Sequence, residues 1–385
     1  MVLSCAAPEA RRKVSLRIVP LRKIPEESSL LERWNDLVLQ MERPEVFYTC
    51  EWALALQSAY QASLRPLLFL GYDGDDLVGV ASLATDLGEQ NVSFLAATTG
   101  DYCEFLSRPE RRTEFVEAVF AELDQLGVVG GLVLANLPAD SATPAALRSA
   151  AKKYHFRVYI RPAYSCLQVE LGSAAQRQTL KTAVMRKRQL RRCLKAMERE
   201  GRVTCVYLRS WAQIEPLLPD FVDAHIARFH AKQGTSFLSK PERRFLLEDL
   251  ARRFSDTGTV TLTILLIGDR RVAWSYGFQF QGGWSLYQTT FDTRCEENSP
   301  GYCLLAKIVI EASEMNTLRQ VDLGLGSEDY KEWFANGTRQ TLYATLTRSL
   351  LRHLRELARY RIATGVKRFP KLDAAIRNAR SRLGL

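Results

Sequence analysis

One series of elements occurs twice along this chain, and this repetition restricts the fold more than any other feature. In each half, apolar runs with strand spacing are separated by short turns and followed by a helix-spaced segment and one more apolar run. The first series comprises residues 67–70, 77–81, 91–96, 110–126 and 131–137, and the second comprises 261–267, 272–280, 284–290, 301–315 and 320–325. A meander followed by a helical crossover is typical of an α/β unit with a mixed sheet. We therefore expect two such units in tandem.

The chain is long enough for this arrangement. Its 385 residues can bury two cores, and 46% hydrophobic with 25% charged residues is ordinary for a globular protein. We predict a disordered N-terminal tail (1–14), a first domain (15–172), a second domain (173–350) and a basic C-terminal helical tail (351–385). The second domain would begin with a long basic linker helix over 176–200. No apolar run approaches the length of a transmembrane helix.

Cysteine and histidine are placed without metal-site spacing. The eight cysteines form no CxxC pair, and there are only four histidines. A disulfide framework, a zinc site and a His-rich metal site are therefore not expected. The N-terminus lacks a long apolar core, so it does not resemble a signal peptide. These features predict a cytoplasmic protein with reduced cysteines and no metal.

The net charge of +10 is concentrated in two segments. Residues 348–385 carry +9 and residues 181–199 carry +7. Such segments fit an anionic partner, which could be a phospholipid surface, a phosphorylated cofactor or nucleic acid. The alternative is that these helix faces simply solvate their charge. Because no aromatic residues are interleaved with the basic runs, specific nucleic-acid binding is not expected.

The step Asn298-Ser299-Pro300-Gly301 opens the helix-spaced segment of the second half. Ser299 can cap the helix, Pro300 suits its first turn, and Gly301 lets a phosphate approach the backbone. The partial positive charge at the helix start would favour that phosphate by up to about 1 kcal/mol. Ser-Pro is also a common helix start with no ligand, and this alternative stays open.

Several motifs, taken together, resemble the CelD/BcsL-type acetyltransferases of the GNAT superfamily, with Fem-type peptidyltransferases as more distant relatives. The resembling motifs are Val46–Trp52, Leu77–Val80, Gly100-Asp101-Tyr102, the basic run 186–197, Ala224–Phe229, Ser299-Pro300-Gly301 and Asp329-Tyr330-Lys331-Glu332-Trp333. The resemblance covers roughly residues 15–350. It implies two tandem GNAT-like domains, each a mixed, mostly antiparallel sheet flanked by helices.

The resemblance also implies acyl transfer from acetyl-CoA or a longer acyl-CoA to an amine- or hydroxyl-bearing acceptor. The acceptor would be an envelope polysaccharide precursor or a lipid. Backbone amides of the strand 284–291 would hold the thioester oxygen, and Ser299, Pro300 and Gly301 would bind the donor. The candidate bases are Asp292, His225 and Glu328. Candidate substrate-binding residues are Tyr287, Lys331, Trp333, Arg228, Asp101 and Tyr102.

Each candidate also has a structural interpretation. Asp292 can be a turn residue, His225 and Tyr287 can be core residues, and Lys331 can be solvated. No cysteine has a histidine at motif spacing, which disfavours an acyl-cysteine intermediate.

Two other functions remain open. One is a Fem-like transferase that takes its acyl group from aminoacyl-tRNA held by the basic helix. The other is a non-catalytic GNAT-fold scaffold at the membrane surface. In the leading interpretation, the basic tail attaches the protein peripherally to the anionic inner membrane, at about 1 kcal/mol per well-placed Lys or Arg.

Overall fold

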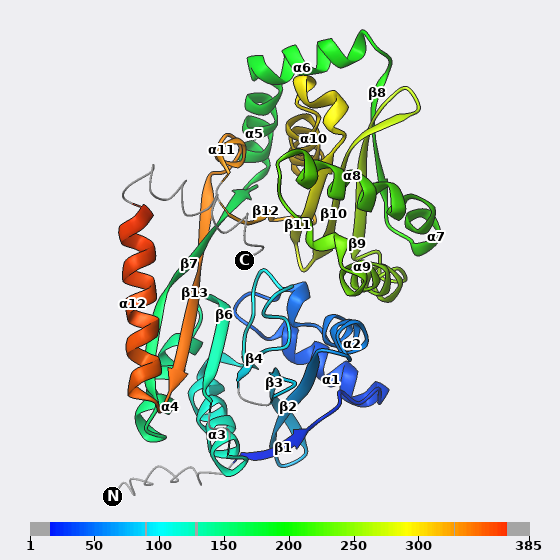
Figure 1. The fold of residues 1–385 in the computed structure, drawn as a ribbon. Helices are drawn as coiled ribbons and strands as arrows, with labels where there is room; N and C mark the ends of the chain where they lie inside the picture. The colour runs from blue at the N-terminus through cyan, green and yellow to red at the C-terminus, as the bar shows by residue number, and fades with distance from the viewer. Residues whose placement is uncertain (1–15, 89–90, 128–129, 327, 368–385) are drawn as a thin grey trace, which may run out of the picture.

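The computed structural model describes residues 16–88, 91–127, 130–326 and 328–367 (Figure 1). The tail predicted over 1–14 lies outside the described residues, as does the part of the basic tail beyond residue 367. The rest forms an α/β fold with one large mixed sheet flanked by helices, as expected.

The first half alternates sheet and helices from β1 to β7. Its elements are β1 (Arg17–Leu21), α1 (Ser28–Leu39), α2 (Cys50–Ala59), β2 (Leu64–Asp73), β3 (Asp76–Asp86), β4 (Val92–Phe94), β5 (Leu106–Ser107), α3 (Arg112–Gln125), β6 (Leu132–Pro138), α4 (Thr143–Lys153) and β7 (Arg157–Glu170).

The second half repeats the pattern from β8 to β13 after two linking helices. Its elements are α5 (Ala174–Arg186), α6 (Arg188–Glu198), β8 (Val203–Leu208), α7 (Trp211–Ile214), α8 (Leu218–Ala231), α9 (Pro241–Arg253), β9 (Val260–Ile267), β10 (Arg270–Phe280), β11 (Gly283–Phe291), α10 (Pro300–Glu314), β12 (Gln320–Leu325), α11 (Asp329–Glu332), β13 (Gly337–Thr347) and α12 (Leu350–Lys367).

The two halves exchange their last strands. The sheet runs in the order β1-β2-β3-β4-β6-β13-β7-β12-β11-β10-β9-β8. β13 from the second half lies beside β6 of the first, and β7 from the first half lies beside β12 of the second. Because β7 and β13 also pair with each other, the long strands join both halves into one sheet (Figure 1). This symmetric exchange follows the sequence repeat and fixes the halves relative to each other.

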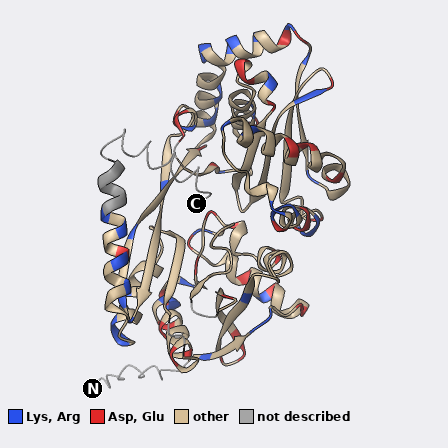
Figure 2. Cartoon of the chain, in the orientation of Figure 1, with Lys and Arg blue, Asp and Glu red and all other residues tan. Residues whose placement is uncertain are grey.

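The single helix expected over 176–200 is two helices. Lys187, between α5 and α6, has ψ of 120°, which breaks the helical hydrogen-bond ladder. Both α5 and α6 pack against α10, and the break lets each helix turn its own apolar residues toward it. Tertiary packing therefore overrides a helical pattern that contains neither Gly nor Pro at this point. Arginines and lysines cover the outer surface of α6 (Figure 2).

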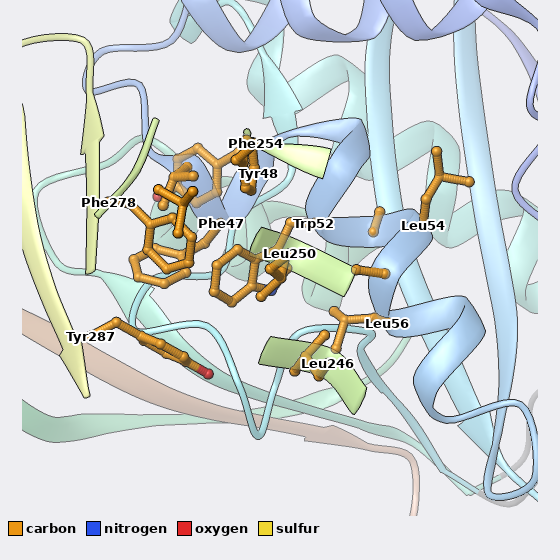
Figure 3. Packing of buried hydrophobic residues seen from close by; sticks show 14 of the residues in the cluster. Phe47, Tyr48, Trp52, Leu54, Leu56, Leu246, Leu250, Phe254, Phe278 and Tyr287 are labelled. Carbon is orange, nitrogen blue, oxygen red and sulfur yellow. The ribbon is translucent and has the colours of Figure 1, made fainter. Parts of the chain in front are cut away.

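The main core lies between the halves. One face of the first-half sheet, covered by α1 and α2, meets the matching face of the second half, covered by α8 and α9. Trp52 of α2 has its ring centroid 5.3 Å from Phe278 of β10 and 5.4 Å from Tyr287 of β11 (Figure 3). Burying each large apolar side chain contributes about 1.5–3 kcal/mol. The opposite faces carry separate cores under α3 and α4 and under α5, α6 and α10.

Candidate functional site

The two central strands of the second half separate partway along their length. β11 pairs in parallel with β12 only over Gly283–Ser285, opposite Gln320–Asp322. β11 nevertheless continues along β10 to Phe291, and β12 continues to Leu325. The backbone of β11 after Ser285 therefore has no strand partner on the side facing β12. Its peptide groups on that side are available to a ligand.

A β-bulge lies where the strands separate. The register of β10 and β11 shifts between Tyr276 and Phe278. A Cβ at the intervening Gly277 would lie 2.3 Å from the carbonyl oxygen of Ser285, so the position requires glycine. The bulge places Leu286 against the core under α10 and Tyr287 against the core between the halves. Side chains of this strand thus reach both faces of the sheet.

A cavity of about 620 Å³ fills the gap between the strands. Its walls come from β11, the end of β12, the start of α10, α8, and the segment around α11. Such a volume is typical of a small-molecule site. The sequence-predicted residues in its lining are Asp101, His225, Arg228, Tyr287, Ser299, Gly301, Glu328, Lys331 and Trp333.

Helix α10 starts at the cavity. Ser299 precedes it in the left-handed conformation (φ 49°), and its side chain makes no cap hydrogen bond, so the expected serine cap is wrong. Pro300 is the first helical residue, and Ser299 and Gly301 line the cavity. With the side-chain cap absent, the amides of the first turn are available to an anion in the cavity. A Cβ at Gly301 would lie 3.3 Å from the Phe291 ring, so the wall is tight here.

The predicted substrate-binding residues Arg228, Lys331 and Trp333 line the cavity. Arg228 donates to the carbonyl oxygen of Thr289 (3.0 Å) and covers the Phe291 ring. Lys331 is buried, donates to the carbonyl oxygen of Leu325 (3.1 Å) and pairs with Glu328 (2.7 Å). Trp333 is 53% exposed and packs edge-on against Tyr302 at the rim. These contacts hold the cavity wall in shape.

Asp101 reaches this cavity from the first half. It lies on the loop after β4, is 8% exposed and lines the same cavity as Lys331. Burial raises the pKa of its carboxyl well above the usual value, the nearby Asp322 raises it further, and Lys331 opposes the shift. A Cβ at Gly324 (φ 76°) would lie 3.3 Å from an Asp101 carboxylate oxygen and 3.2 Å from the Leu286 carbonyl oxygen. Glycine at this position lets the carboxylate approach the point where the strands separate.

The neighbouring Tyr102 points away from the cavity. Its hydroxyl donates to Asp322 (2.6 Å), which also accepts from Gln168 (2.8 Å) and from the backbone amide of Gly324 (2.8 Å). The guanidinium of Arg339 covers the Tyr102 ring and pairs with Glu45. Although Arg339 lowers it, burial raises the pKa of Glu45 to about 7. Tyr102 therefore belongs to a buried network that joins the halves behind Asp101.

The three predicted bases have different surroundings. His225 is buried and lines the cavity, and its Nδ1 is 2.8 Å from the Ser236 hydroxyl. Burial and the charge of Arg228 lower its pKa to about 4, so the imidazole is neutral at neutral pH. Glu328 lines the cavity with a side chain that is 56% exposed.

Asp292 is not among the residues that line the described cavities. Both of its carboxylate oxygens accept from the Arg294 side chain. These hydrogen bonds lower the pKa of Asp292. Asp292 also accepts from the Arg294 amide, so it fulfils the turn role left open for it.

Three residues that line the cavity were not candidates from the sequence: Gln189 of α6, Gln288 of β11 and Gly324 of β12. Gln189 lies in the basic run 186–197 and Gln288 in the strand 284–291, but neither pattern marks its glutamine as a site residue. Gly324 could have been suspected because Gly324 and Gly326 alternate at the end of a strand. The two glutamines could not, because only the packing of α6 and β11 around the cavity brings them together.

Three further observations concern the described residues. The cysteines described there are free. No group of three or more potential metal ligands comes together in this part of the chain. Over the same residues, none of the helices combines the length and apolar composition needed to span a membrane.

Residues 185–332 match the family model of the acetyltransferase (GNAT) domain. The second half has a GNAT fold. The match contains all of the residues that line the cavity except Asp101 and Trp333. No curated protein matches the chain.

Solved structures share this fold across most of the chain. FemX has 9% identity and a TM-score of 0.57, covering 88% of this chain and 99% of FemX. A conserved protein of unknown function from Bacteroides thetaiotaomicron has 12% identity and a TM-score of 0.52, covering 82% of this chain and 97% of that protein. A tandem GNAT protein from the clavulanic acid biosynthesis pathway has 12% identity and a TM-score of 0.44, covering 86% and 98%. At such identities the matches to FemX and to the Bacteroides protein concern the fold alone.

Proposed function

We propose that this protein is an acyl-CoA-dependent acyltransferase. The observation that carries the proposal is the cavity between the separated strands β11 and β12, with the start of α10 at its wall. The pantetheine arm of a coenzyme A thioester would lie between the strands. Its pyrophosphate would bind the free backbone amides in the first turn of α10, from Gly301 onward, since Pro300 has no N–H and the Ser299 amide donates to the Glu296 carbonyl oxygen. The basic surface of α6, next to α10, would favour the remaining phosphate.

The chemistry would use groups already placed in the cavity. Unpaired amides of β11 after Ser285 would hold the thioester oxygen as negative charge develops on it. Asp101 would accept the proton of the attacking amine or hydroxyl, because its raised pKa makes it a stronger base than an exposed carboxylate. His225 and Glu328 remain alternative bases within the same cavity.

The acceptor would be an envelope polysaccharide precursor or a lipid. Support for this finer assignment is the resemblance of the short motifs to the CelD/BcsL type. Peripheral attachment of a cytoplasmic enzyme to the inner membrane would fit it. Leu350, Leu351 and Leu354 of α12 are exposed next to Arg355 and Arg359, a combination suited to an anionic lipid surface.

A Fem-like transfer from aminoacyl-tRNA is the second candidate. The exposed Arg188, Arg191 and Arg192 of α6 favour it, because a row of cations can contact a nucleic-acid backbone. The fold shared with FemX is compatible with either donor. A non-catalytic scaffold is disfavoured by the open cavity, since a fold that no longer binds a donor has no need of one.

The deciding experiment measures thermal stability with coenzyme A, acetyl-CoA, palmitoyl-CoA and bulk tRNA. A ligand at 100 times its Kd stabilises the folded state by about 2.7 kcal/mol. We expect stabilisation by a thioester, and its loss in Gly301→Trp, which fills the cavity beside Phe291. Glu110→Trp, at the exposed turn before α3, is the matched control and should keep the response. Stabilisation by tRNA alone would replace the acyl-CoA proposal with the second candidate.

A further inference from the structure

A second cavity of about 550 Å³ adjoins the donor cavity. Asp101, Tyr287, Gln288 and Leu325 line both cavities. The second cavity opens at the ends of β4 and β6 of the first half, and its further walls come from β7, β13 and α9. It therefore lies between the halves, and Asp101 stands where it meets the donor cavity.

Two arginines from different halves face this second cavity. Arg243 of α9 donates to the carbonyl oxygen of Thr98 (2.7 Å) and lies over the rings of Tyr60 and Phe237. Arg161 of β7 lies 4.3 Å from the ring centroid of Tyr343 and donates to the carbonyl oxygen of Pro162 (3.2 Å). Both side chains are held by rings and carbonyl groups, so each guanidinium has a fixed position.

Neither of these arginines forms an ion pair with a carboxylate among the described residues. The fully buried Arg112 and the nearly buried Arg339 differ, since each pairs with a buried glutamate. An arginine that faces a cavity and has no carboxylate partner of its own is suited to bind an anion from outside the protein. Of the residues that line the second cavity, Asp101 alone is acidic.

We propose that the second cavity binds the acceptor, and that this acceptor carries a phosphate or carboxylate held by Arg161 and Arg243. The proposal rests on the acyltransferase function proposed above. It deepens that function by naming the acceptor class: an anionic amine or alcohol. The rings of Tyr343 and Phe237 would cover the apolar part of the molecule.

The placement is consistent with the chemistry. With its anionic group at the arginines, the acceptor presents its amine or hydroxyl to the thioester at Asp101. The nucleophile's lone pair forms the new C–N or C–O bond, and the C–S bond breaks with its electron pair remaining on the coenzyme A sulfur. The proton lost by the nucleophile goes to Asp101 and from there to the thiolate, which leaves as the free thiol.

The test measures anion binding with the donor cavity occupied. The full chain is saturated with coenzyme A, and its thermal stability is measured with millimolar pyrophosphate (phosphate arm) or citrate (carboxylate arm), against chloride at equal ionic strength. We expect at least one arm to stabilise the protein, and the stronger arm identifies the anionic group. Arg161→Gln and Arg243→Gln should each weaken that anion at least tenfold.

The control is Arg244→Gln, the neighbouring exposed arginine of α9, which donates to Ser239 instead and should retain binding. An unchanged response to coenzyme A shows that each variant is folded. No stabilisation in either arm, or equal stabilisation in all variants, would overturn the anionic-acceptor proposal while leaving the acyltransferase proposal intact. Failure of coenzyme A itself to stabilise the protein would instead count against the acyltransferase proposal; the anion arms are then measured without it.

Discussion

The two halves differ at the start of the helix that follows the meander. In the first half, α3 starts at a buried arginine, and in the second half, α10 starts at an open cavity. At the start of α3, the guanidinium of Arg112 has 0% exposure and donates to Ser107 (2.9 Å) and Thr143 (2.8 Å). It also pairs with Glu104 (3.3 Å) and Glu42 (3.2 Å). At the start of α10, the corresponding space is part of the 620 Å³ cavity. The same architecture thus supports a packed core in one half and an open cavity in the other.

The parallel pairs β4–β6 and β11–β12 are both short, but the chain that follows the first strand of each pair takes a different course. β4 pairs in parallel with β6 only over Val92–Ser93, just as β11 pairs with β12 over three residues. In the first half the chain then turns into the loop that carries Asp101. This loop reaches across to the second half. In the proposed function the halves would divide the work: the second would bind the donor, while the first would supply an acidic group and most of the acceptor cavity.

The largest expected effect comes from removing the first half's contribution to the donor cavity. Asp101→Asn should lower kcat about 100- to 10,000-fold, because a general base contributes this much. Stabilisation by coenzyme A should remain, since the start of α10 is untouched. The exposed turn variant Asp75→Asn is the control, and kcat is measured by thiol release. If Asp101→Asn kept full activity, His225 and Glu328 would become the preferred bases.

The same variant has a defined pH signature. In the wild type, activity should rise as pH increases through the raised pKa of Asp101, because the ionised form is the base. Stability should change in the opposite direction, because the Asp101 carboxyl binds its proton more tightly in the folded state than in the unfolded state. The free energy of unfolding should therefore fall as pH rises from the usual carboxyl pKa of about 3.8 through the raised folded pKa. Asp101→Asn should reduce this fall, and Glu45, whose pKa is also raised by burial, accounts for a remaining part. Urea unfolding at several pH values would show the reduction. A fall of unchanged size in the variant would assign it to Glu45 and other groups.

Substitution of the buried Arg112 at the start of α3 should reduce stability and leave function intact. Arg112→Met leaves the buried Glu104 without its cation and should cost about 3–5 kcal/mol in unfolding free energy. Arg111→Met, on the same turn with partly exposed ion pairs, should cost less than about 1 kcal/mol. Adding Glu104→Gln to Arg112→Met should restore part of the loss. Loss of coenzyme A binding in folded Arg112→Met would contradict the division between the halves.

The network that joins the halves should show a smaller effect. Tyr102→Phe removes one of three donors to the buried Asp322 and should cost about 1–3 kcal/mol. Tyr164→Phe is the comparison, because Tyr164 is 50% exposed and should change the unfolding free energy little. Chemical denaturation measures both variants. Equal stability of the two would mean that Gln168 and Gly324 satisfy Asp322 by themselves.

The smallest effect is expected at the rim of the donor cavity. Trp333→Ala removes an exposed ring that packs edge-on against Tyr302 at 5.4 Å. Aromatic pairs of this kind contribute about 0.5–1.5 kcal/mol, so KM for the donor should rise about 2- to 10-fold with kcat nearly unchanged. Steady-state kinetics with acetyl-CoA would measure it. A matching fall in kcat would place Trp333 closer to the reacting atoms.

Local pattern was sufficient for most of the elements. The strands expected over 261–267, 272–280, 284–290 and 320–325 coincide with β9 to β12 within two residues at each end, because alternating apolar residues and glycine turns are local signals. The helix expected over 301–315 is α10, which begins at Pro300. The break at Lys187 was not predictable, since it depends on where α10 lies. Likewise, Ser299 suggested a cap from its residue type, whereas its left-handed backbone excludes one.

The sequence by itself determined the duplication, the α/β class and the position of the helix start at Ser299–Gly301, since each depends on periodicity or on residues adjacent in the chain. Only the tertiary structure decided which halves meet and what they share. Three features join residues more than 80 positions apart. They are the exchange of β7 and β13, the place of Asp101 in the cavity of the other half, and the presence of Arg161 and Arg243 in the lining of one cavity. Such contacts arise from packing the two halves against each other around Trp52 and Tyr287, and no local pattern encodes the geometry of that packing.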